Sequence, residues 1–115
     1  LEQRLTVLIG QYSQRGESLL PMWTFVETLQ RRSTEASDML VQMYNANRLL
    51  LSTWFAGELA GLPAESRERT LNALAMAMAP ESWVVLRQRL GLGVEQAREE
   101  LGFVSRAILN GAARA

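Results

Sequence analysis

The chain has 115 residues, of which 48% are hydrophobic and 21% are charged, so it forms one domain with a sizeable core. Its twelve arginines balance its twelve acidic residues, which excludes the basic excess that DNA-binding domains use to hold phosphates. The absence of histidine and cysteine removes the commonest general base, the thiol nucleophile and the usual zinc ligands.

Apolar residues at helical spacing predict six helices, with glycine and proline at their ends. The first helix spans residues 1–14 and ends near Gly16. The second begins around Ser18 as its N-cap, carries Pro21 in its first turn and runs to about Arg31.

The third predicted helix is the longest, from Ser33 or Thr34 to about Ala60, and Gly61 and Pro63 end it. Its apolar residues occupy two stripes that leave little polar surface. A helix that is apolar nearly all round is normally buried, so we expect it to lie in the middle of the domain.

The fourth predicted helix spans residues 64–78, and the fifth opens at Pro80, a favoured first helical residue. A Gly91-Leu92-Gly93 break separates it from the sixth helix, residues 94–110, which Gly111 stops. No strand-like alternation is sustained anywhere. The sequence therefore predicts an all-α bundle of about six helices, in which residues 1–115 form a single domain.

Three polar residues, Asn47, Arg48 and Glu58, interrupt the apolar stripes of the third helix. An unpaired buried polar group costs roughly 1–3 kcal/mol, so each needs a partner, a water molecule or the surface. In one interpretation Arg48 and Glu58 pair or reach solvent and Asn47 bonds to neighbouring backbone. In the other, one or two of them orient a ligand in a cavity.

Methionine and aromatic residues are concentrated in the second and third helices. Such residues usually fill a core, but flexible methionines and flat aromatic faces also suit a pocket for bulky hydrophobic molecules. The candidate ligand-binding residues are Met22, Trp23, Phe25, Val26, Met39, Met43, Tyr44, Asn47, Trp54 and Glu58.

No pattern indicates catalysis or a cofactor. The glutamates near residues 65–68 and 95–100 fall on exposed helix faces, and Gly91-Leu92-Gly93 lacks the strand and lysine of a phosphate-binding loop. No apolar run approaches the roughly 20 residues of a membrane span, and no signal peptide is visible. We therefore expect a cytoplasmic protein that is no enzyme, holds no metal and has no membrane partner.

The C-terminal half resembles the regulatory domain of the TetR family of bacterial transcriptional repressors. The resemblance covers residues 64–110, whereas residues 1–62 fit by architecture alone. Gly93 stands where the family usually has a serine or aspartate cap for the last helix. The residues that carry the likeness are Leu71, Leu74, Pro80-Glu81-x-Trp83, Leu86, Arg87, Gly91-Leu92, Val94-Glu95-Gln96-Ala97, Leu101, Ile108 and Leu109.

The resemblance implies a homodimer, with a four-helix interface built from two helices of each subunit. The apolar stripes of these two helices are rich in small residues, which suits close contact between subunits. The alternative is that the stripes face the subunit's own core, as one of them partly must. The implied interface residues are Leu71, Leu74, Met78, Ala97, Leu101, Val104 and Ile108.

The resemblance also implies a small hydrophobic effector that controls DNA binding by an N-terminal helix-turn-helix domain, which this chain lacks. The chain begins at Leu1, inside a helical pattern, so we expect residues to precede it in the parent protein. DNA would then be a partner only through that missing domain. The alternative is a helical protein–protein or dimerisation module without a small-molecule ligand.

Overall fold

A computed structural model describes residues 1–114, and helices account for nearly all of them. The predicted all-α class is confirmed, and these residues contain no strand. The helices are α1 (Glu2–Leu19), α2 (Trp23–Arg32), α3 (Thr34–Trp54), α4 (Ala56–Ala60), α5 (Ala64–Ala77), α6 (Pro80–Val84) and α7 (Val94–Ala113), with a 3-10 turn at Leu20–Met22 and a π-helical turn at Val85–Arg89.

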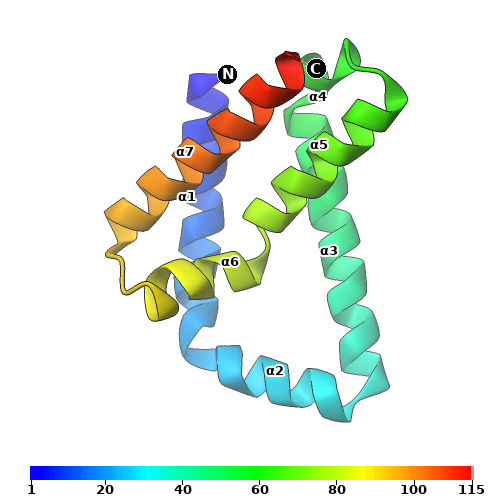
Figure 1. Ribbon diagram of the computed structural model, residues 1–115. Coiled ribbons are helices and arrows are strands. Elements are labelled where there is room, and N and C mark those ends of the chain that lie inside the picture. The colour runs from blue at the N-terminus through cyan, green and yellow to red at the C-terminus, as the bar shows by residue number, and fades with distance from the viewer. Residues whose placement is uncertain (115) are drawn as a thin grey trace.

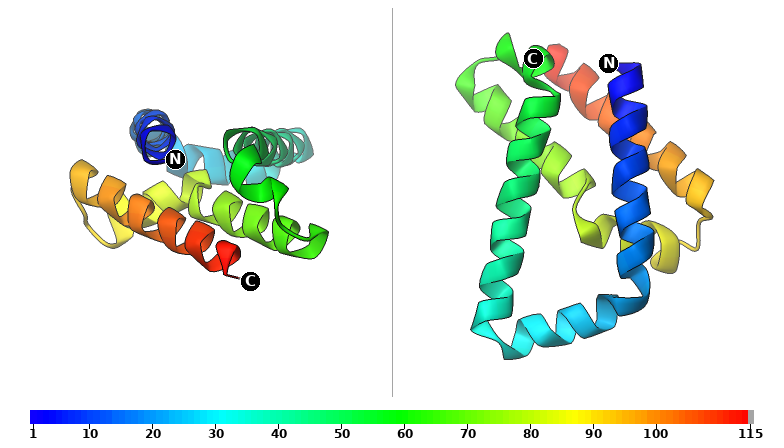
Figure 2. Two further views of the ribbon diagram at one scale, coloured as in Figure 1. Left: turned by 90° about the horizontal axis from the view of Figure 1, so that it is seen from above. Right: turned by 180° about the vertical axis from the view of Figure 1, so that it is seen from behind.

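The helices form two layers. In one layer the long helices α1 and α3 are separated from each other and joined at one end by α2 (Figures 1 and 2). In the other layer α5 and α7 lie side by side. Helix α5 packs on both α3 and α7, α7 packs on α1, and α6 crosses α1. The molecule is only 19 Å thick, which is about two helix diameters.

The core lies where the two layers meet, and not around α3. It takes one face of α1, the α3–α4 junction, the inner faces of α5 and α7, and the indole of Trp83. Its buried members are Leu5, Leu8, Ile9, Tyr12, Leu51, Phe55, Leu59, Leu71, Leu74, Met78, Trp83, Ala97, Leu101 and Leu109.

Helix α1 runs past Gly16 to Leu19, beyond its predicted end. Glycine inside a helix costs about 1 kcal/mol, but here it admits the ring of Trp83. A Cβ built on Gly16 would lie 2.5 Å from the indole Cδ1, so only glycine lets α1 approach so closely. Burying a large side chain contributes about 1.5–3 kcal/mol, which outweighs the glycine's cost.

The predicted start of the second helix at Ser18 is wrong. Ser18 still belongs to α1, and its hydroxyl donates a hydrogen bond to the Gln14 carbonyl. The chain turns at Leu20–Met22 because Pro21 has no N–H to continue the ladder, and α2 begins at Trp23.

The long third helix is divided, and its expected burial is wrong. Ser33 caps α3 as predicted, by accepting a hydrogen bond from the Ala36 N–H. The helix breaks at Phe55, whose ring is completely buried, and α4 continues to Ala60. Leu51 alone in α3 is buried, while Met39, Val41 and Leu49 are exposed, because α3 touches other helices on one side only.

The predicted glycine break after α6 is confirmed. Gly91 has φ +68°, a left-handed conformation that favours glycine. The Gln96 side chain accepts a hydrogen bond from the Gly93 N–H at 3.2 Å, which supplies the half of a capping box that does not need a side chain at Gly93. Helix α7 continues through Gly111 to Ala113, past its predicted stop. Among residues 1–114, no helix combines the length and apolar character that crossing a bilayer needs.

Candidate functional site

A groove of about 340 Å³ lies between the long helices α1 and α3. One wall comes from α1, the other from α3, and the floor comes from the end of α5 and the start of α6. Its lining is mostly apolar with a few polar groups, the usual composition of a small-molecule site. The lining residues are Tyr12, Arg15, Gly16, Leu19, Met43, Tyr44, Ala46, Asn47, Leu50, Met78 and Pro80.

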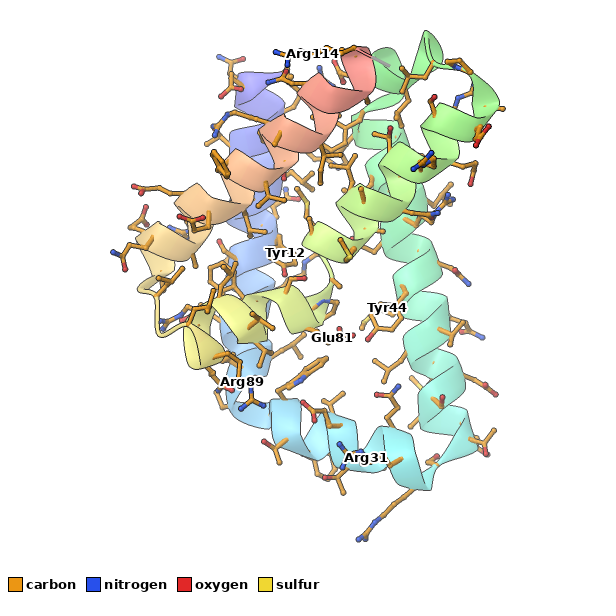
Figure 3. The ribbon with its side chains drawn as sticks, in the orientation of Figure 1. Tyr12, Arg31, Tyr44, Glu81, Arg89 and Arg114 are labelled. Carbon is orange, nitrogen blue, oxygen red and sulfur yellow. The ribbon has the colours of Figure 1, made fainter. Side chains whose placement is uncertain are left out.

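Hydrogen bonds fix three polar side chains of this groove, those of Tyr12, Tyr44 and Asn47. The Tyr44 hydroxyl donates to the Glu81 carboxylate at 2.7 Å, and Figure 3 shows the two side chains meeting between α3 and α6. Asn47 Nδ2 donates to the Met78 carbonyl at 3.4 Å, and the Tyr12 hydroxyl donates to the Ala79 carbonyl. Burial raises the pKa of both tyrosines, and the bond to Glu81 adds to the rise at Tyr44. Both hydroxyls therefore keep their protons at neutral pH.

The floor of the groove is tied to α1 by one carboxylate. Glu17 accepts a hydrogen bond from Trp83 Nε1 at 2.7 Å and two from the Arg87 guanidinium, at 2.9 and 3.1 Å. The Arg87 hydrogen bonds, together with that from Trp83, hold the pKa of Glu17 below its usual range. Arg87 also donates to the Leu92 carbonyl, so it links α1 to the glycine break. Trp83 and Arg87 thus hold α6 and the π-helical turn against the α1 wall.

Three predicted ligand residues, Met43, Tyr44 and Asn47, line the groove together. The others lie elsewhere. Met22 in the 3-10 turn, Phe25 on α2 and Met39 on α3 are exposed away from the groove lining, whereas Trp23 is buried and Val26 is half-buried. Trp54 packs against the core, and Glu58 is paired with Arg4.

The first of the two interpretations of the polar residues matches their contacts. Arg48 pairs with Glu68 and donates to Asn72, and Glu58 accepts two hydrogen bonds from Arg4, at 2.7 and 2.8 Å. Asn47 bonds to backbone, as that interpretation requires, but it also lines the groove. It is therefore the member of the three that a ligand in the groove could contact.

The α1 wall was missed by the sequence-based prediction. Tyr12, Gly16 and Leu19 recur at spacings of four and three residues, with Arg15 beside them, so they share one side of the helix. Tyr12 also belongs to the face of α1 that packs in the core with Leu8 and Ile9. Helical periodicity identifies the apolar face of α1, but it does not show which part of that face other helices leave uncovered.

The predicted interface residues mostly face inward, which corrects their assignment to a dimer surface. Five are buried in the subunit's own core, namely Leu71, Leu74, Met78, Ala97 and Leu101, and Ile108 packs against that core. A residue such as Leu101, 3% exposed, cannot touch a second copy. The apolar stripes do pack together, but they join α5 to α7 within the chain. Val104, 39% exposed, is the one that reaches the surface.

A second groove of about 480 Å³ lies between α1 and α7. Of its four charged side chains, Glu99 has no partner within residues 1–114, and the other three are engaged. Arg98 donates to Ser13 and Glu95, and Arg106 pairs with Glu2. Because these ion pairs leave few free groups for a ligand, the groove between α1 and α3 is the better candidate despite its smaller volume.

Comparison with known proteins adds no relative. The chain matches no protein-family model, no curated protein and no solved structure. The groove itself is therefore the basis for assigning a function.

Proposed function

We propose that this chain is the effector-binding and dimerisation domain of a TetR-like bacterial transcriptional regulator that works in the cytoplasm. The observation that carries the proposal is the mostly apolar groove between α1 and α3, with Tyr44 and Asn47 fixed at its wall. A small hydrophobic molecule enters this groove. DNA binding belongs to an N-terminal helix-turn-helix domain outside this chain.

The layout of the helices supports a two-state mechanism. Helices α1 and α3, the two long walls of the groove, run from α2 to the opposite end of the molecule. Leu1 and the last turn of α7 lie at that opposite end (Figure 1). A ligand that binds better when α1 and α3 are at one separation shifts the population toward that arrangement. Movement of α1 then reaches whatever precedes Leu1.

The proposal includes a homodimer formed through the outer faces of α5 and α7. Phe103 is 69% exposed and Met76 is 72% exposed, and Val104 lies on the same pair of helices. Large apolar side chains on the surface of adjacent helices are typical of a subunit contact. This outer face replaces the mostly inward-facing residues that the resemblance implied for the interface.

A dimerisation module without a ligand is the second candidate. The exposed apolar residues Met22, Phe25 and Met39 favour it, because they offer a further surface for a protein partner. In that case the groove holds only water.

The test is titration with N-phenyl-1-naphthylamine, a neutral dye that fluoresces in apolar sites. We expect the wild-type chain to bind it and Ala46→Trp, which fills the groove, to lose binding. Asn45→Trp is the matched control, since Asn45 is exposed on the same helix and does not line the groove. Equal binding by wild type and Ala46→Trp would place the dye elsewhere, and no binding at all would favour the module without a ligand.

A further inference from the structure

Arg15 is the only charged residue that lines the groove between α1 and α3. Its guanidinium has no ion pair or hydrogen bond within residues 1–114. Arg15 is itself exposed, whereas the partly buried arginines are paired. Arg48 pairs with Glu68, Arg87 with Glu17 and Arg98 with Glu95. Arg15 therefore brings to the groove a positive charge that no neighbouring carboxylate neutralises.

The two carboxylates nearest in the sequence to groove residues are both engaged. Glu17, two residues from Arg15, accepts hydrogen bonds from Trp83 and Arg87. Glu81, next to Pro80, accepts the Tyr44 hydroxyl and does not itself line the groove. A cationic ligand would have to displace these donors, whereas an anionic ligand finds a free partner in Arg15.

The rest of the lining selects for an apolar body. Leu19, Met43 and Leu50 come from the two walls and Met78 from the floor. The volume of about 340 Å³ is near the lower end of the range for small-molecule pockets, roughly 300–1,000 Å³. The groove thus suits one compact apolar molecule with a single charged group at its edge.

We propose that the effector is an amphipathic anion, an aromatic or aliphatic body with one carboxylate or sulfonate group that Arg15 binds. This inference rests on the proposed effector-binding function and names the chemical class of its ligand. The planar guanidinium can donate two parallel hydrogen bonds to such a head group.

The experiment uses two dyes that share one ring system. N-phenyl-1-naphthylamine is neutral, and 8-anilinonaphthalene-1-sulfonate is the same body with a sulfonate. Both are titrated against the wild-type chain, Arg15→Gln and Arg69→Gln. Arg69 is the matched control because it is exposed on α5, away from the groove, and has no ion pair within residues 1–114.

We expect Arg15→Gln to raise the Kd of the sulfonate dye about tenfold, which is about 1.4 kcal/mol, and to leave the neutral dye within about twofold. Arg69→Gln should change neither. Ala46→Trp should abolish binding of both dyes, which ties the effect to this groove.

The outcomes separate the two proposals. If the neutral dye binds but Arg15→Gln does not weaken the sulfonate dye, the anionic class is refuted and the effector-binding function stands. An equal loss in Arg15→Gln and Arg69→Gln would refute the anionic class too, because it would reflect net charge alone. If neither dye binds the wild-type chain, the effector-binding function fails and the inference fails with it.

Discussion

Trp83 is the residue on which the two layers meet. Its indole is fully buried, its Nε1 donates to Glu17, and Tyr12 packs edge-on against it with ring centres 5.9 Å apart. It rests directly on Gly16, which also lines the groove. The wall of the candidate site and the centre of the core are therefore the same few residues.

Gly16→Ala should lower the stability of the fold. The new methyl group would lie 2.5 Å from the indole, so Trp83 must move, and forced repacking of this kind costs about 1–3 kcal/mol. Gly10→Ala in the same helix meets nothing within 4 Å and should instead raise stability by about 0.5–1 kcal/mol. Urea denaturation of the two variants checks this, and similar values for both would contradict the close contact at Gly16.

At the residue scale, the sequence singled out individual side chains that hold the fold together, but not the residues to which they bond. Trp83 and Arg87 stood out in the TetR-like pattern, but their common partner Glu17 did not. The contact spans 66–70 residues of sequence, and helical periodicity carries no information at that distance. The same holds for Arg4 and Glu58, which are 54 residues apart.

At the scale of elements, α1 is fixed by ion pairs at both ends. Glu2 pairs with Arg106 of α7, Arg4 with Glu58 of α4, and Glu17 with Arg87. In each pair the hydrogen bond from the arginine is the largest cause that lowers the pKa of the glutamate. The ionised carboxylates therefore hold the α1 wall of the groove in place.

Acid should loosen this attachment. A carboxyl whose pKa is lowered by folding contributes its stability above the unfolded value, about 4.3 for glutamate, and loses it as the pH falls through the folded value. We expect the free energy of unfolding to fall below about pH 4.3. Glu58→Gln should be less stable at pH 6 and decline less with acid.

Denaturant titrations from pH 6 to pH 3 measure these slopes. Asp38→Asn is the control, because Asp38 is exposed and makes no ion pair within residues 1–114. A Glu58→Gln slope equal to that of wild type would mean that the pair with Arg4 does not shift the titration.

Helix identity followed from periodicity, whereas helix ends were decided by tertiary contacts. The break at Phe55 illustrates this, since its neighbours Trp54 and Ala56 are not helix-breaking residues. Phe55 leaves the helical conformation but keeps its hydrogen bonds, donating from its N–H to the Leu51 carbonyl and accepting from the Leu59 N–H. Burying its ring contributes about 1.5–3 kcal/mol, and a pattern read along one helix cannot reveal that contact.

At the scale of the whole molecule, the chain is flatter than its length requires. Its radius of gyration is 14.8 Å, against about 13 Å for a compact domain of this size. Two layers of helices 19 Å thick leave the outer sides of both layers open. The prediction that α3 is buried was wrong because α3 lies in the middle of the sequence but in an outer layer of the structure (Figure 2).

The same flatness makes the outer faces of α5 and α7 the natural place for a second copy. A stable dimer buries about 1,200–2,000 Å² in total, so the exposed apolar side chains Met76 and Phe103 would lie inside such a contact. Phe103→Arg places a charge on the exposed surface of α7 and should convert the proposed dimer into a folded monomer. Val7→Arg, at a half-exposed position on α1, should leave the dimer intact. Sedimentation velocity gives the mass, and circular dichroism shows that both variants stay helical. A wild-type monomer, or an unchanged dimer in Phe103→Arg, would remove this face from the interface.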